Sequence, residues 1–216
     1  MKRMVKMKPD GMTGKIYQVL ELFMKIAYLN LLWMLFTLLG FGIFGVVPAS
    51  VALLAVVRKW LMKDTDIPIF TLYFRTYKNQ FIQSNIFGLI FAFAFIILYI
   101  NYSYLFVESG LLQVILTIGL ILNSIIFLVT FIYFFPVYVH YNLRFLEYLK
   151  HSFLMGMINI HFVLLLSFIF VIIYHLFIYF PVYVGLFLPS MIGLTLMSIT
   201  LISFNIFEKK RVRLGK

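Results

Sequence analysis

The sequence predicts an all-α, polytopic membrane protein with about six transmembrane helices. Its composition, its long apolar segments and the placement of its charges all indicate this class. Of the 216 residues, 64% are hydrophobic and 12% are charged, whereas soluble domains are about half apolar and about a quarter charged. Mean hydropathy is +1.06. A soluble fold of this size could not bury so much apolar surface.

Several continuous apolar segments approach or reach the length of a membrane span: residues 86–100, 111–135, 162–180 and 184–204. A helix needs about 20 residues to cross about 30 Å of hydrocarbon. The segments are apolar all round, whereas strands of a transmembrane barrel alternate apolar and polar residues. They therefore predict a helical bundle.

The basic residues predict the orientation of this bundle. All 18 Lys and Arg fall within residues 2–25, 58–78, 144–150 and 209–216. Basic loops resist translocation and remain in the cytoplasm, so we expect both termini there. We attribute the net charge of +11 to contacts with membrane lipids, whose anionic headgroups attract basic segments. No nucleic-acid partner is expected.

The first part of the chain predicts a tail followed by a helical hairpin. Residues 1–15 are charged and contain proline and glycine, which indicates a cytoplasmic tail. The apolar run 26–57 is too long for one straight crossing. Its middle contains residues that favour a turn, Gly40, Gly42, Gly45 and Pro48. We predict spans near 22–40 and 46–62 with an external turn between them. The alternative is a re-entrant hairpin entered from the cytoplasm.

Segment 67–80 is amphipathic and predicts a helix lying along the inner leaflet. Aromatic residues recur every three or four positions, and basic residues lie opposite them. The candidate lipid-facing residues are Phe70, Tyr73, Phe74, Arg75, Tyr77 and Lys78. The alternative is that the aromatic face packs on the protein itself.

The rest of the chain predicts four further spans. These lie near residues 81–106, 111–139, 153–179 and 182–207 and complete a single transmembrane domain over 16–208. Glu108 lies in the predicted external turn of the first pair. Residues 209–216 form a second basic cytoplasmic tail.

Two ridges of small residues predict close helix packing. One consists of Ser84, Gly88 and Ala92, and the other of Ala49, Ala52 and Ala55. Small side chains let transmembrane helices approach closely. We assign both ridges to packing within the chain, with a homo-oligomer as the alternative.

The sequence offers little for catalysis, so we expect no enzyme activity, cofactor or metal. The chain has no Cys, and no metalloprotease, nucleophile-elbow or phosphate-loop motif occurs. His161 and His175 are about 21 Å apart along a helix, too far to share an ion. With Asn30 and Asn123 they are the candidate intramembrane polar residues. Such residues either form hydrogen bonds between helices or line a substrate path.

Several segments together resemble the YesL-like family of bacterial membrane proteins of unknown function. They are YLNLLW at 28–33, GFGIFG at 40–45, PAS at 48–50, VRKW at 57–60, DIPIF at 66–70 and FRTYK at 74–78. The resemblance implies a multi-pass protein of the bacterial plasma membrane, often found with carbohydrate-uptake and sugar-degradation systems. It implies no catalytic residues, because the family has no established activity.

Taken with the resemblance, the sequence predicts a non-enzymatic protein that assists or regulates carbohydrate uptake. Its partner would be a carbohydrate permease or another membrane protein. The alternative is a small transporter or channel that acts by itself.

Overall fold

The computed structural model describes residues 12–106 and 109–213, which are almost entirely helical. Within these residues there are seven helices and no strand: α1 (Met12–Leu39), α2 (Ile43–Leu61), α3 (Ile69–Tyr104), α4 (Leu111–His140), α5 (Phe145–Ile158), α6 (Ile160–Tyr179) and α7 (Pro181–Arg213). All except α5 contain a segment long and apolar enough to cross a membrane. The prediction of a helical membrane protein with about six spans is confirmed.

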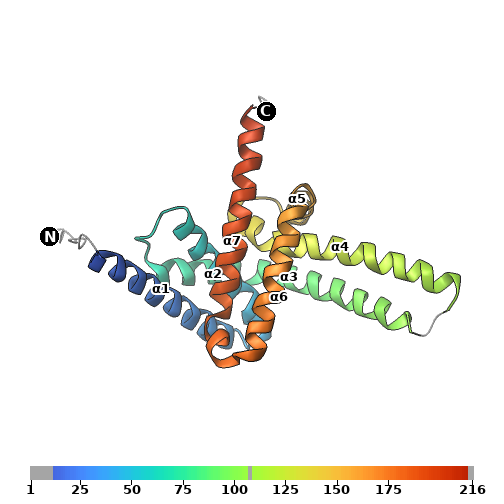
Figure 1. The fold of residues 1–216 in the computed structure, drawn as a ribbon, viewed down its shortest axis with the longest axis horizontal. Coiled ribbons are helices and arrows are strands. Elements are labelled where there is room, and N and C mark those ends of the chain that lie inside the picture. Colours follow the sequence, from blue (N-terminus) through green and yellow to red (C-terminus); the bar gives the residue numbers. More distant parts are fainter. Residues whose placement is uncertain (1–11, 107–108, 214–216) are drawn as a thin grey trace.

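The helices form three hairpins, and α2, the second helix of the first hairpin, is the most central. Helices α1 and α2, α3 and α4, and α6 and α7 are the antiparallel pairs, and the α3–α4 hairpin extends away from the rest of the molecule (Figure 1). Helix α2 packs against α1, α3, α4 and α7. Half of its span window, 50%, is buried, against 11–28% for the other spans. The core of the protein therefore surrounds α2.

The α1–α2 hairpin confirms the predicted glycine turn. Helix α1 ends at Leu39 and α2 begins at Ile43. Gly42 has φ 71, which glycine adopts without steric cost. A Cβ on Gly45 would lie 2.2 Å from the Thr37 carbonyl oxygen and 2.7 Å from its Cα. Glycine is therefore required where the two backbones touch.

The amphipathic segment is not a separate helix, because α3 runs without interruption through the predicted boundary at residue 81. Tyr73 and Tyr77 are buried. Their hydroxyls donate to the carbonyl oxygens of Ala49 at 3.0 Å and of Phe36 at 2.9 Å. The lipid-facing assignment is therefore wrong for these two residues. A buried tyrosine needs a partner for its hydroxyl, and the backbones of α1 and α2 provide one.

The other four residues assigned to the lipid surface are exposed: Phe70, Phe74, Arg75 and Lys78. The two phenylalanine rings stack on each other at 6.1 Å, and both also contact the ring of Phe36 on α1. Their contact with lipid stays a prediction.

The predicted span over residues 153–179 is wrong in its first part. Helix α5 ends at Ile158, and the helical path is interrupted at Asn159, where φ is −114 and ψ is 41. The Asn159 side chain donates to the Met155 carbonyl oxygen at 2.9 Å. Gly156 lets α5 lie against α4, since a Cβ there would be 2.4 Å from Val129 Cγ1. Only α6 is long enough to span.

Both predicted tails are partly helical. Helix α1 begins at Met12 and includes Gly14, and α7 continues to Arg213, since residues 208–213 contain no glycine or proline. The remaining tail residues and Glu108 lie outside the described residues.

The two small-residue ridges lie in the packed interior except at one end of each. Ser84, Ala49 and Ala52 are fully buried, and a Cβ on Gly88 would lie 2.9 Å from Val47 Cγ2. Ala55 is half-buried and lines a cavity. In contrast, Ala92 is exposed; its assignment to this packing is wrong, because at this level of α3 the buried residue is Phe91.

Candidate functional site

The four candidate intramembrane polar residues do not come together. Asn123, His161 and His175 are exposed. Asn123 donates to the Gly119 carbonyl oxygen at 2.9 Å, one turn back along its own helix. His175 Nδ1 lies 2.8 Å from the Val171 carbonyl oxygen in the same way. In the part of the chain that the structure describes, no group of three or more His, Cys, Asp or Glu could hold a metal ion.

Asn30 is different, because it is buried and joins two helices. Its Oδ1 accepts a hydrogen bond from the backbone N–H of Ser190 at 3.1 Å, and its Nδ2 donates to the Ile26 carbonyl oxygen at 2.9 Å. Ser190 directly follows Pro189 inside α7, where the proline cannot donate a helical hydrogen bond. Asn30 therefore fixes α1 to the proline-containing part of α7.

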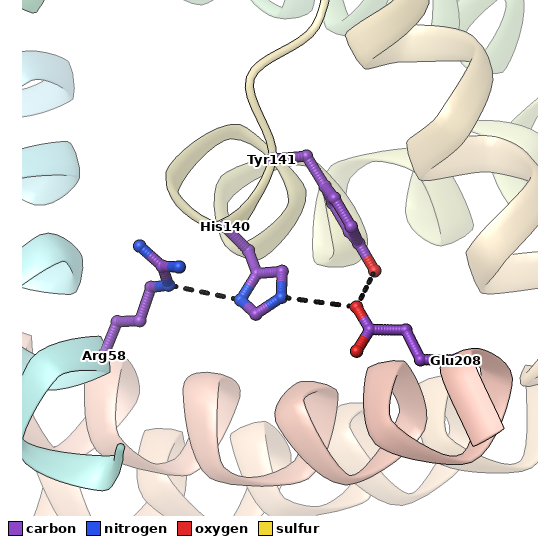
Figure 2. Close-up of polar contacts among 4 residues, drawn as sticks. All are labelled: Arg58, His140, Tyr141 and Glu208. Atoms are coloured by element: carbon purple, nitrogen blue, oxygen red, sulfur yellow. Dashed lines mark hydrogen bonds and ion pairs between the residues drawn. The ribbon is translucent and has the colours of Figure 1, made fainter. Parts of the chain in front are cut away.

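A polar cluster that the sequence did not predict lies at the ends of α2 and α4 and beside the end of the apolar span of α7. It consists of Arg58, His140, Tyr141 and Glu208 (Figure 2). Arg58 Nε donates to His140 Nδ1 at 3.2 Å, and His140 Nε2 lies 3.8 Å from Glu208 Oε1. The Tyr141 hydroxyl donates to the same carboxylate oxygen at 3.4 Å. These contacts join three helices from distant parts of the sequence, α2, α4 and α7.

The direction of these contacts assigns the histidine proton. Since His140 Nδ1 accepts from a guanidinium, the neutral ring carries its proton on Nε2, the nitrogen nearest Glu208. The ring then links a cation on one side with a carboxylate on the other. His140 holds the Nε edge of Arg58 in place and leaves its terminal nitrogens for other ligands (Figure 2).

A cavity of about 240 Å³ adjoins Arg58 between α2, α3 and α4. The polar residues of its lining are Arg58, Lys59, Thr76, Gln80 and Tyr138. The apolar ones are Val51, Ala55, Leu72 and Val139. The Tyr138 hydroxyl donates to Gln80 Oε1, so the amide nitrogen of Gln80 is left as the donor. None of the lining residues is acidic. The cavity thus offers cations and hydrogen-bond donors.

Two further contacts gather basic segments at the same end of the molecule. Lys59 pairs with Asp64 at 3.1 Å, and Lys25 of α1 donates to the Thr65 carbonyl oxygen at 3.4 Å. With the polar cluster, these contacts bring the ends of α2 and α4, the part of α7 around Glu208 and the chain around Lys25 into one region. An even number of crossings places these segments on one side. Which side of the membrane they occupy stays a prediction.

Sequence reasoning missed this region because its residues are separated by up to about two thirds of the chain, from Arg58 to Glu208. A usable signal did exist: Arg58, His140 and Glu208 each stand in or near the last turn of the second helix of a hairpin or of its membrane span. Because the hairpins return to one side, residues at these positions meet. Gln80 and Tyr138 carried no comparable signal.

The cluster and its cavity belong to a chain with clear relatives. A family model described as a protein of unknown function, DUF624, matches residues 26–102. The uncharacterized protein YesV of Bacillus subtilis (strain 168) is 41% identical over 144 residues, which cover 67% of this chain and 69% of YesV.

Two further relatives come from the same organism. The uncharacterized protein YteU is 34% identical over 187 residues, covering 87% of this chain and 84% of YteU. The uncharacterized protein YesL is 37% identical over 130 residues, covering 60% of this chain and 61% of YesL. No solved structure matches the chain significantly. The matched segment includes the α1–α2 hairpin, Arg58 and the packed part of α3, and the chain belongs to this YesL-like DUF624 family of proteins of unknown function.

Proposed function

We propose that the protein is a non-enzymatic accessory or regulatory component of a carbohydrate uptake system in the bacterial plasma membrane. The sequence resemblance supports the biological setting. We infer the mode of action from the outer part of the α3–α4 hairpin, residues 89–104 and 111–128. Most of its side chains are not covered by the rest of the chain (Figure 1). We call this segment the outer arm.

The outer arm exposes a polar side chain at a place where membrane hydrocarbon would contact it. Asn123 lies near the middle of α4 and is exposed. Its amide nitrogen bonds to Gly119 at 2.9 Å, which leaves the Oδ1 carbonyl for a partner. A Cβ on Gly119 would meet nothing within 4 Å. Gly119 therefore leaves room for another helix to approach Asn123.

A permease helix could donate a hydrogen bond to the exposed Asn123 carbonyl, whereas lipid hydrocarbon cannot. Burying an amide oxygen in hydrocarbon without a hydrogen bond is unfavourable, and helices in membranes associate through small residues and interhelical hydrogen bonds. We therefore assign the partner to a transmembrane helix of the uptake system that donates a hydrogen bond to Asn123. A second copy of this chain is the competing occupant.

Replacing Asn123 with leucine should weaken this association about 3- to 30-fold, the range that interhelical hydrogen bonds of 0.6–2 kcal/mol give. The measurement is the amount of sugar-permease subunit that co-purifies with the tagged protein in mild detergent. Asn101→Leu is the matched control, because Asn101 also lies on the outer arm, is half-buried and likewise donates one turn back, to the Ile97 carbonyl oxygen at 2.9 Å.

Three outcomes of this experiment can be separated. Loss of the permease subunit with Asn123→Leu but not with Asn101→Leu supports the proposal. Recovery of a second, differently tagged copy in place of the permease assigns the face to a homo-oligomer. Absence of any permease subunit from the wild-type protein contradicts the accessory role.

The alternative function is a small transporter or channel, and the polar cavity beside Arg58 is the observation that favours it. A cavity with cationic and uncharged donors could form part of a solute path. Solute flux into liposomes that contain only the purified protein would support this alternative.

A further inference from the structure

We infer that the cavity beside Arg58 is a binding site for a phosphate group. The site would stand whether or not the chain serves an uptake system. Its ligand is either the headgroup of an anionic lipid or a soluble phosphate.

Charge and hydrogen bonding select an anion. The lining contains the guanidinium of Arg58 and the ammonium of Lys59, and it contains no carboxylate. Lys59 is already paired with Asp64 at 3.1 Å, so Arg58 supplies the positive charge that is not compensated at the cavity. Phosphate matches a guanidinium geometrically, because two of its oxygens can accept from two N–H groups at once.

The guanidinium is held in the orientation that such a ligand needs. Within the described residues, the polar contact of Arg58 is made through Nε to His140 at 3.2 Å. Glu208, 3.8 Å from the other ring nitrogen, holds that imidazole in turn (Figure 2). His140 and Glu208 are therefore positioning residues, and the terminal nitrogens of Arg58 remain for the ligand.

The neutral part of the lining adds donors and a surface for carbon atoms. The Thr76 hydroxyl and the Gln80 amide nitrogen can both donate, since the oxygen of Gln80 is occupied by Tyr138. Val51, Leu72 and Val139 provide an apolar wall. A volume of about 240 Å³ has room for a phosphate group with a few attached carbon atoms.

The test uses the purified full-length protein in neutral detergent and follows its thermal unfolding midpoint during two titrations. One probe is dioctanoyl phosphatidylglycerol and the other is inorganic phosphate. A ligand that binds the folded state raises the midpoint as its concentration exceeds Kd. Stabilisation by phosphatidylglycerol alone assigns a lipid headgroup, and stabilisation by inorganic phosphate also admits a soluble ligand.

Variants show whether the effect comes from the cavity. Arg58→Gln should weaken the apparent affinity at least about tenfold, as expected for the loss of charged hydrogen bonds. Thr76→Val, which keeps the side-chain shape, should weaken it by less and serves if Arg58→Gln does not fold. Lys63→Gln removes an exposed charge outside the cavity and should bind like the wild type.

The site is contradicted by either of two results. One is that neither probe gives a saturable rise in the midpoint. The other is that Lys63→Gln loses as much affinity as Arg58→Gln or Thr76→Val, because general surface charge then explains the effect.

Discussion

Replacing Gly45 with alanine should destabilise the protein by about 3 kcal/mol, at the upper end of the range for overpacking a tightly packed core. The added Cβ would lie 2.2 Å from the Thr37 carbonyl oxygen and 2.7 Å from Thr37 Cα. These are backbone atoms, so no side-chain rotation relieves the clash. The hairpin between α1 and α2 would have to open, and α2 is the helix around which the core forms.

The measurement for Gly45→Ala is the thermal unfolding midpoint and the folded yield in detergent. Gly119→Ala is the matched control, because a Cβ there meets nothing within 4 Å. Alanine is favoured over glycine in a helix by about 1 kcal/mol, so the control should be unchanged or slightly more stable. Equal midpoints for the two variants would show that the α1–α2 crossing is not in contact.

Replacing Asn30 with leucine should cost about 2 kcal/mol, within the range for leaving a buried polar group without its partner. Asn30 is 2% exposed and accepts from the backbone N–H of Ser190 at 3.1 Å. Leucine cannot accept a hydrogen bond, so the α1–α7 contact loses its polar link. The same unfolding assay measures this effect.

Asn123→Leu is the control for the Asn30 substitution. Asn123 is exposed and bonds within its own helix, so its loss should leave the stability of the isolated protein nearly unchanged. If Asn30→Leu were as stable as Asn123→Leu, the structural role of Asn30 would be wrong. A role in lining a substrate path would then be the better interpretation.

Residues that act locally made much of the fold predictable. The glycine turn at residues 40–42 ends α1 and starts α2 as expected, because glycine conformation is a property of the local chain. The spans of α4, α6 and α7 follow from apolar length alone. The resemblance to the YesL-like family is confirmed by the family match over residues 26–102, the part of the chain that contains its motifs.

Features that depend on which helix faces which were not predictable. Amphipathicity cannot distinguish lipid from the backbone of α2, so Tyr73 was assigned to the wrong environment. The interruption at Asn159 was hidden because apolar residues flank it on both sides. The Arg58–His140–Glu208 cluster depends on α2, α4 and α7 coming together, and the position of each residue near the end of a span becomes informative only once the hairpins are known.

Cysteine accessibility tests most directly whether the chain crosses the membrane six times with its basic ends in the cytoplasm. The chain has no native Cys, so single introduced cysteines can be read without background. Ile43 reports on the α1–α2 turn better than Gly42, since it is 83% exposed and does not have the positive φ of the glycine. Ser109 and Phe180 report on the two other hairpin turns, and Thr65 reports on the opposite end; all three are exposed.

With an impermeant maleimide on intact cells, cysteines at 43, 109 and 180 should react, whereas Thr65→Cys should react only after permeabilisation. Full reaction of every variant in denaturant is the control for expression and reactivity. Reaction at 109 and 180 without reaction at 43 would contradict six crossings and support a re-entrant hairpin. Reaction of Thr65→Cys on intact cells would contradict the cytoplasmic placement of the basic ends.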